Sequence, residues 1–173
     1  MTKKLSIRKK YKTELNNLGY NIDHMHPYNI ILDIDETLIH SKINNENISI
    51  ILRPNLRLFL DYCYQHFNVG YWTLGTKKYC LHILSKILTQ EQLNKTKHSS
   101  VIISRTDKKN NDEYEEIVRT NIFKVNRLDN MLTKPLHYLF DTEPYKFWFK
   151  QHNTFIIDNT SCAISVNIHN SVL

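Results

Sequence analysis

The chain has few of the residues that interrupt or cross-link small proteins. Its 173 residues include only three glycines, four prolines and three cysteines. The cysteines, Cys63, Cys80 and Cys162, are odd in number, widely spaced and without a C-x-x-C pair. Neither a disulfide framework nor a zinc ribbon is indicated, so we expect a reducing, intracellular compartment, nuclear or cytoplasmic.

Long hydrophobic runs are also missing. No apolar stretch approaches the roughly 18 residues that a membrane span needs. The first dozen residues, MTKKLSIRKKYK, are basic but lack the apolar segment of a signal peptide. We interpret residues 1–27 as a basic arm and lead-in. A frayed, solvated terminus is the simpler interpretation, and a nuclear-import or phosphate-binding role is the alternative.

The bulk composition indicates one globular domain. The chain is 41% hydrophobic and 23% charged, and its length suffices for one domain with a core. A net charge of +6 favours an anionic partner, such as a phosphorylated peptide, nucleic acid or an acidic lipid surface. The many asparagines and lysines suggest an A/T-rich genome, viral or protozoan, so an infected cell is one expected setting.

Strand and helix patterns alternate along the chain. Residues 28–35, YNIILDID, contain consecutive apolar residues, which predicts a strand buried on both faces. Helical spacing follows in 52–67, where Pro54 and Asn55 precede the helix, and in 76–88, where Thr76 is a plausible cap. The further predicted elements are strands in 68–74, 100–104 and 154–160, a short helix in 133–140 and a charged loop over 105–130. This alternation predicts an α/β fold, a Rossmann-like parallel sheet flanked by helices.

Two of the predicted strands end in acidic residues. Asp33 and Asp35 follow the first strand, and Asp158 and Asn159 follow the last. Ligands of open parallel sheets bind at the carboxyl ends of strands, so these groups are expected to converge. Several carboxylates repel one another unless a cation lies among them, and Mg²⁺ prefers such oxygen ligands.

The D-x-D pair has two other interpretations. It can be an ordinary strand-to-turn transition, and Asp-Asn after a strand can be an Asx turn. A calcium-binding EF-hand loop also begins D-x-D. That interpretation fails because Leu38 takes the place of the required glycine and Asn44 that of the twelfth-position glutamate.

The surrounding residues favour a specific resemblance. DIDETL resembles the D-x-D-x-[TV] signature of the haloacid dehalogenase superfamily of phosphotransferases. DIDETLIH, residues 33–40, is similar to the branch of RNA polymerase II C-terminal-domain (CTD) phosphatases and small CTD phosphatases. The later motifs of that branch occur in order as Arg53–Pro54, Trp72–Thr73, Lys134 and Asp158–Asn159. The resemblance implies a haloacid dehalogenase-like phosphatase domain over residues 28–173.

The resemblance also implies roles for residues. Asp33 would be the nucleophile that forms an aspartyl-phosphate, and Asp35 the general acid and base. Thr73 would bind a phosphoryl oxygen, and Lys134 would neutralise the phosphate. The implied Mg²⁺ ligands are Asp33, Asp35, Asp158 and Asn159. The simpler alternatives are a strand-end threonine and a solvated lysine at a helix start before Pro135. We interpret Arg53 as structural or peripheral, and Trp72 and the tyrosines as core.

Departures from the family pattern concern the end of the chain. Thr160–Ser161–Cys162 replaces the usual Ser-Pro, Pro135 follows Lys134 where an acidic residue is common, and the chain stops at Leu173, before the final strand and helix expected from the family. These departures put stability and the substrate groove in question more than the chemistry.

The substrate class is inferred from how few residues are available to form a cap domain. Only residues 41–50 separate the first motif from Arg53–Pro54, so no sizeable cap domain is expected. An open site admits a protein chain, which predicts a Mg²⁺-dependent phosphatase acting on phosphoserine or phosphothreonine of an RNA polymerase II CTD-like peptide. The alternatives are an uncapped nucleotide or nucleic-acid-end phosphatase, and a catalytically silent phosphopeptide-binding scaffold.

Overall fold

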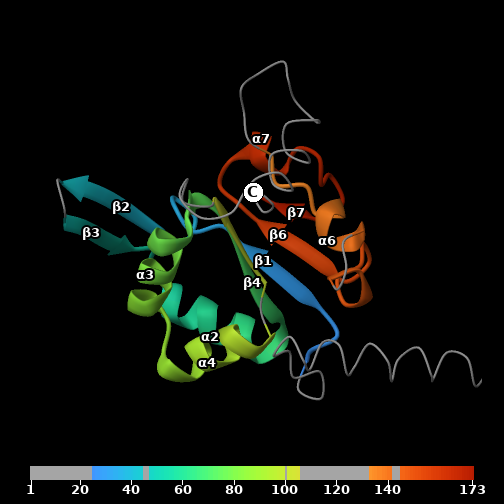
Figure 1. Cartoon of the computed structure of the whole chain (residues 1–173), viewed down its shortest axis with the longest axis horizontal. Coiled ribbons are helices and arrows are strands. Elements are labelled where there is room, and N and C mark those ends of the chain that lie inside the picture. The colour runs from blue at the N-terminus through green and yellow to red at the C-terminus, as the bar shows by residue number, and fades with distance from the viewer. Residues whose placement is uncertain (1–24, 45–46, 100, 106–132, 142–144) are drawn as a thin grey trace, which may run out of the picture.

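A five-stranded parallel sheet forms the centre of the molecule (Figure 1), with strand order β5-β4-β1-β6-β7. The computed structural model describes residues 25–44, 47–99, 101–105, 133–141 and 145–173. The strands are β1 Asn29–Leu32, β4 Asn68–Thr76, β5 Ile102–Arg105, β6 Thr154–Ile157 and β7 Ser171–Val172. The first four confirm the predicted strands, whereas β7 was not predicted.

Helices cover both faces of the sheet, as the parallel pattern predicted. Ile30 and Leu32 of β1 lie in one buried cluster with residues of α2 and α3. Ile31, between them, lies in a second cluster with residues of α6 on the opposite face. The helices are α2 Leu56–His66, α3 Lys77–Ile87, α4 Gln90–Ser99, α6 His137–Asp141, α7 Ser161–Ile164 and the 3₁₀ helix η2 Tyr145–Phe147. The α/β prediction is therefore confirmed.

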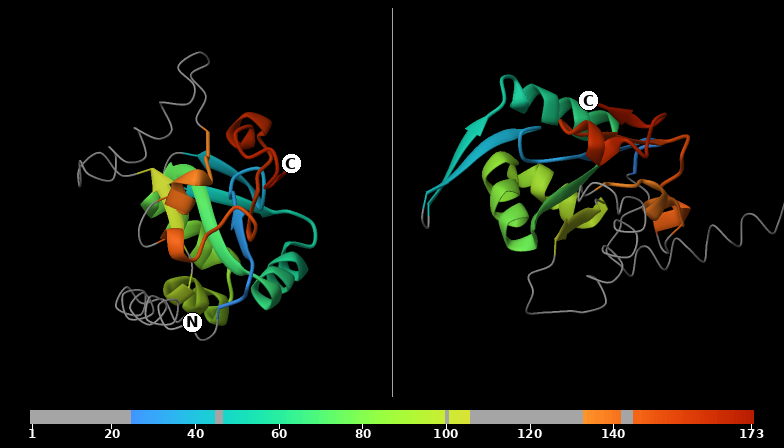
Figure 2. Two further views of the ribbon diagram at one scale, coloured as in Figure 1. Left: turned by 90° about the vertical axis from the view of Figure 1, so that its right-hand side faces the viewer. Right: turned by 90° about the horizontal axis from the view of Figure 1, so that it is seen from above.

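A β-hairpin fills the interval that the sequence left as a connection. Strands β2 Ile39–Asn44 and β3 Asn47–Leu52 pair antiparallel and extend away from the main sheet (Figures 1 and 2). Ile48 and Ile50 pack against the core, which fixes one side of the hairpin. Within the described parts of the chain, this hairpin is the only insertion between the first motif and α2, so no sizeable cap stands there.

The two predicted helix starts use different devices. α3 begins after Thr76, whose Oγ1 accepts the backbone N–H of Tyr79 at 3.2 Å, so the predicted cap is confirmed. α2 begins after Asn55, which makes no side-chain cap hydrogen bond and has φ of 60°. Asparagine is suited to that left-handed backbone region, and the Asn55 carbonyl accepts the backbone N–H of Phe59 at 3.0 Å, so Asn55 begins the helix through its backbone.

Gly70 allows β1, β4 and β5 to lie close together. A Cβ atom at this position would be 2.7 Å from Ile31 Cδ1 and 2.8 Å from Val101 Cγ1. Both neighbours are buried in the cluster beneath the sheet. One of the chain's three glycines is therefore required by packing.

A polar network fixes β1 at its amino end. Asn29 is opposite Asn68 on one neighbouring strand and Thr154 on the other. Its side-chain amide donates to Thr154 Oγ1 at 3.2 Å, and its Oδ1 accepts from Asn68 Nδ2 at 2.9 Å. The three residues are buried and hydrogen-bonded, which specifies the register of the central strands.

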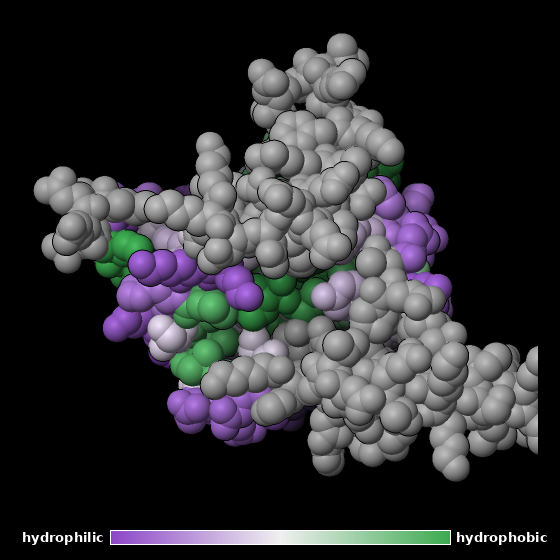
Figure 3. All heavy atoms as spheres, in the orientation of Figure 1, coloured by the Kyte–Doolittle hydropathy of each residue, from purple (hydrophilic) through white to green (hydrophobic). Residues whose placement is uncertain are grey.

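Some parts of the structure differ from the prediction or lie outside the described residues. α4, α7 and β7 are additions, and the predicted charged loop over 105–130 falls almost entirely outside the described residues. No helix among the described residues has the length and apolar character needed to cross a membrane. Hydrophobic side chains are exposed between hydrophilic ones on the face seen in Figure 3.

Candidate active site

Asp33 directly follows β1, at the end of the sheet where the carboxyl ends of the parallel strands meet. Its backbone N–H donates to Ile157 O of β6 at 3.0 Å, which holds the residue between the strands. Thr37 Oγ1 donates to Asp33 Oδ2 at 2.9 Å, and the Lys134 ammonium donates to Oδ1. Asp33 is only 6% exposed, so its carboxylate is almost fully buried.

Lys134 joins the two acidic strand ends. Its Nζ lies 2.6 Å from Asp158 Oδ2 and also donates to Asp33. The backbone N–H of Lys134 donates to Ala163 O at 2.6 Å, and its carbonyl accepts from Asn167 Nδ2 at 2.7 Å. The interpretation of a solvated lysine at a helix start is wrong, because the residue is 2% exposed and precedes α6, which begins at His137.

Asp158 and Asn159 face the site from the end of β6. Asp158 is buried, and its Oδ1 accepts the backbone N–H of Thr160 at 2.8 Å, the hydrogen bond of an Asx turn. Asn159 is exposed, and its Oδ1 lies 3.2 Å from Thr37 Oγ1. Thr37 therefore contacts oxygens from both predicted motifs, Asp33 Oδ2 and Asn159 Oδ1.

The buried charges do not balance. Asp33 and Asp158 contribute two carboxylates, while Lys134 contributes one ammonium. Burial raises the pKa of Asp33 above its ordinary value, and the nearby Asp158 carboxylate adds to the increase. Attraction to Lys134 and its hydrogen bond lower the pKa but do not cancel the effect of burial. The site therefore favours an additional positive charge.

Asp35 points to a different set of partners. Ser41 Oγ of β2 donates to Asp35 Oδ1 at 3.0 Å, and the hydroxyl of Tyr79 in α3 donates to the same oxygen. Burial, together with the hydrogen bond to Asp35, raises the pKa of Tyr79 to about 12. The Tyr79 hydroxyl thus remains a donor at neutral pH. The sequence predicted the tyrosines as core. The half-buried Tyr79 ring packs against the core, as predicted, whereas Tyr28 and Tyr62 are exposed, which contradicts the prediction.

Thr73 is placed in β4 at the same edge of the sheet. β4 continues to Thr76, two residues beyond the predicted end at residue 74, but its pairing with β5 becomes irregular after Trp72. Thr73 is 2% exposed, and its Oγ1 accepts the backbone N–H of Gly75 at 3.0 Å. Trp72 is buried, as predicted.

Arg53 has a structural contact with the loop that follows Asp35. Its guanidinium donates to the carbonyl of Glu36, and its backbone N–H donates to Leu38 O at 3.0 Å. Glu36 has φ of 60°, an uncommon conformation for a residue with a side chain. Arg53 therefore holds a turn in the D-x-D-x-T loop, which agrees with the structural interpretation from sequence.

The oxygen donors at this edge fit Mg²⁺ by chemistry. Asp33 Oδ2 and Asn159 Oδ1 lie within hydrogen-bond distance of the same Thr37 hydroxyl. The described residues contain no group of three or more His, Cys, Asp or Glu side chains arranged to hold a metal. Mg²⁺ sites often use one or two carboxylates and retain several waters, so an oxygen set with two or three protein donors matches this ion.

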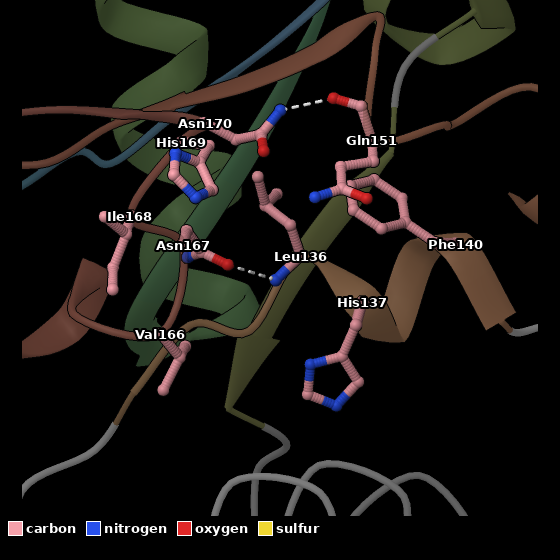
Figure 4. A pocket seen from close by; sticks show the side chains of 9 residues that line it. All are labelled: Leu136, His137, Phe140, Gln151, Val166, Asn167, Ile168, His169 and Asn170. Carbon is pink, nitrogen blue, oxygen red and sulfur yellow. Dashed lines mark hydrogen bonds between the residues drawn. The ribbon is translucent and has the colours of Figure 1, made fainter.

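A pocket is lined by other residues, although Asn167 on its wall also donates to the Lys134 carbonyl. It encloses about 270 Å³ and is lined by Leu136, His137, Phe140, Gln151 and Val166 to Asn170 (Figure 4). Asn167 Oδ1 accepts the backbone N–H of Leu136 at 2.9 Å on its wall. None of the predicted site residues lines this pocket, so the acidic edge of the sheet remains the candidate site.

Comparison with known families agrees with the fold and the motif order. The model of the NLI interacting factor-like phosphatase family matches residues 28–173. The chain therefore belongs to this family, and the predicted relation to CTD phosphatases within the haloacid dehalogenase superfamily is confirmed.

This chain matches less than half of the length of each individual relative. A 45-residue segment is 42% identical to the CTD phosphatase-like protein 355R of Invertebrate iridescent virus 3, over 26% of this chain and 24% of that protein. A variant of the fission yeast RNA polymerase II CTD phosphatase Fcp1 bound to beryllium fluoride matches with a TM-score of 0.56 and 14% identity. A second Fcp1 structure has a TM-score of 0.54 and 16% identity. Each covers 96% of this chain but only 44% of the Fcp1 chain, so they show a shared fold.

Proposed function

We propose that this chain is a Mg²⁺-dependent phosphatase that removes phosphate from serine or threonine of a protein substrate. The buried arrangement of Lys134 between Asp33 and Asp158 carries the proposal. Family membership supports phosphatase chemistry on this arrangement. An RNA polymerase II CTD-like phosphopeptide is the substrate class that the relatives' names favour.

The first step is phosphoryl transfer to Asp33. One carboxylate oxygen of Asp33 bonds to phosphorus as the bond from phosphorus to the serine or threonine oxygen breaks. Asp35 gives its proton to that leaving oxygen. Lys134, which donates to Asp33, would offer positive charge next to the transferred group. Thr73 Oγ1 accepts the Gly75 N–H, so its own O–H would be free to donate to a phosphoryl oxygen.

The second step regenerates the carboxylate. Asp35, now ionised, takes a proton from water, and the water oxygen bonds to phosphorus as the bond to Asp33 breaks. Inorganic phosphate leaves, and both aspartates return to their starting protonation states. One residue can serve as acid and then base because the two steps use it in opposite directions.

The residues that would hold Mg²⁺ are Asp33 through Oδ2, Asn159 through Oδ1 and Asp35 through its backbone carbonyl. Asp158 would act beside them, because its Oδ2 accepts from Lys134 and its Oδ1 from Thr160. When bound, the ion supplies positive charge that offsets the excess carboxylate and the charge of the phosphoryl group.

The insertion that follows the first motif is a small hairpin. The β2–β3 hairpin is the insertion nearest the first motif within the described residues, and it is too small to enclose a substrate. A peptide strand can therefore approach, and the net charge of +6 favours one that carries several phosphates. The same charge favours an oligonucleotide end, which is the second candidate substrate.

The decisive experiment compares wild type with Asp33→Asn. Hydrolysis of an aryl phosphate is measured with Mg²⁺ and with chelator, followed by a CTD-like phosphopeptide and a 5′-phosphorylated oligonucleotide as competitors. Metal-dependent turnover that is lost in the variant and inhibited by the peptide is the expected result. Inhibition by the oligonucleotide alone would favour the second candidate. A folded wild type without turnover would overturn the enzyme proposal in favour of a phosphopeptide-binding scaffold.

A further inference from the structure

Asp35 is held by two hydroxyl groups from different parts of the chain. The Tyr79 hydroxyl and Ser41 Oγ both donate to Asp35 Oδ1, the latter at 3.0 Å. The two hydroxyl oxygens are themselves 2.9 Å apart. Tyr79 belongs to α3 and Ser41 to β2, so the contact joins the hairpin to the helix across the carboxylate.

Two local features place Tyr79 for this contact. Its backbone N–H donates to Thr76 Oγ1 at 3.2 Å, which fixes the first turn of α3. Its ring lies against Gly75, where a Cβ atom would approach Tyr79 Cδ1 to 2.8 Å and Thr73 Oγ1 to 3.3 Å. The absence of a side chain at Gly75 therefore lets the tyrosine ring lie beside the Thr73 hydroxyl.

The two oxygens of Asp35 are in different situations. Oδ1 accepts two O–H donors, whereas Oδ2 has no side-chain hydrogen-bond partner among the described residues. A protonated carboxyl group carries its proton on one oxygen, and the oxygen that already accepts two donors is the unfavourable one for it. The proton of a neutral Asp35 is thus directed to Oδ2.

We propose that Tyr79 and Ser41 are positioning residues that occupy Oδ1 of Asp35 and so confine the transferable proton to Oδ2. The inference rests on the proposed phosphatase function. In the first step the proton moves from Oδ2 to the leaving oxygen as the phosphorus–oxygen ester bond breaks. In the second step Oδ2 accepts the proton of the attacking water. Both transfers require the same carboxylate orientation, which the two hydroxyls maintain.

The test uses the leaving group to separate proton transfer from other effects. The alkoxide of a phosphoserine peptide needs a proton to depart, whereas 4-nitrophenolate departs without one, so only the peptide depends on a well-placed acid. The values of kcat/KM for both substrates are measured for wild type, Tyr79→Phe and Ser41→Ala. The ratio of peptide to aryl phosphate kcat/KM is expected to fall about 10- to 100-fold in Tyr79→Phe, the range expected for loss of a hydrogen bond to a charged group.

Tyr62→Phe is the matched control, because Tyr62 is 58% exposed on α2 and removal of its hydroxyl should leave the ratio unchanged. Equal losses on both substrates in Tyr79→Phe and Ser41→Ala would indicate a general structural role and overturn the inference. Unchanged ratios in an active enzyme would overturn it as well. If Tyr79→Phe does not fold, the ratio in Ser41→Ala decides alone. A wild type inactive on both substrates would instead overturn the proposed function.

Discussion

The Nζ atom of Lys134 lies 2.6 Å from Oδ2 of Asp158, and each side chain is only 2% exposed. The same ammonium also donates to the carboxylate at the end of β1. One buried cation therefore links two neighbouring parallel strands at the edge where the candidate chemistry lies. Desolvating three charged groups is costly, and the arrangement is stable only while each charge keeps its partner.

Lys134→Met is expected to destabilise the fold. The variant fills similar space but leaves two adjacent buried carboxylates without their cation. The expected loss in the free energy of unfolding is about 3–5 kcal/mol, the range for removing one partner of a buried ion pair. Urea denaturation with chelator measures it. Lys86→Met, an exposed residue in the last turn of α3, is the control, and equal stability of the two variants would contradict the prediction.

Asp33→Asn is expected to abolish turnover while raising stability at neutral pH. Burial raises the pKa of Asp33 in the folded state, so the folded protein binds this proton more tightly than the unfolded chain. The stabilisation from this group is complete below the unfolded pKa of about 3.9 and is lost as the pH rises through the folded pKa. Asparagine does not ionise, so the Asp33→Asn variant does not lose this stabilisation as the pH rises.

Thermal or urea unfolding of both proteins with chelator, between about pH 4 and pH 7, measures this effect. The stability of wild type relative to Asp33→Asn should decrease as the pH rises. Asp141→Asn, at the exposed end of α6, serves as the control and should follow wild type. If the stability of wild type relative to Asp33→Asn instead increased with pH, attraction to Lys134 would outweigh burial.

The cysteines are expected to differ in reactivity. Burial raises the pKa values of Cys63 and Cys80 to about 12, whereas Cys162 is partly exposed. Because the thiolate is the reactive form, a thiol reagent at about pH 8 should label one cysteine rapidly in the folded protein and three in denaturant. Cys162→Ser should remove the rapid phase, and a rapid phase that persists in this variant would show that one of the two core thiols is accessible.

Gly70→Ala is expected to destabilise the sheet by about 1–3 kcal/mol, the usual cost of overpacking. The added methyl would lie 2.8 Å from Val101 Cγ1 and 3.1 Å from the Val101 carbonyl. Adding Val101→Ala should recover part of the loss, since it removes one of the two side-chain clashes and leaves the contacts with Ile31 Cδ1, at 2.7 Å, and with the Val101 carbonyl. The unfolding free energies of the two single variants and the double variant provide the measurement, and simple additivity would argue against the clash.

Local patterns predicted the elements that bury apolar residues. The run Ile30 to Leu32 specified a two-faced strand, and helical spacing specified α2 and α3, because burial on one or both faces leaves a direct periodic signal. α4 was missed because its sequence, QEQLNKTKHS, is mostly polar. The hairpin was missed because only a few of its residues face the core, among them Ile48 and Ile50.

The site was predictable to the extent that its residues follow strands. The meeting of the β1 and β6 ends follows from parallel pairing, and the structure brings Asp33, Asp158 and Lys134 together. The burial of Lys134 depends on contacts with Ala163 and Asn167, which no local pattern encodes. The contact of Tyr79 with Asp35 spans 44 residues, and a tyrosine in an amphipathic helix resembles any core aromatic.

The hydrogen-bonded asparagines at the amino end of β1 have a consequence at the opposite end. A slip of β1 by one residue would move Asp33, which follows the strand, by about 3.3 Å and turn the strand's side chains to the other face. Asn29 opposes such a slip because it is bonded to both neighbouring strands at once. The Asn29 amide thus fixes the position along the strand direction of Asp33, the proposed nucleophile, without contacting it. Substituting Asn29 should therefore impair phosphate transfer before the molecule loses its tertiary structure.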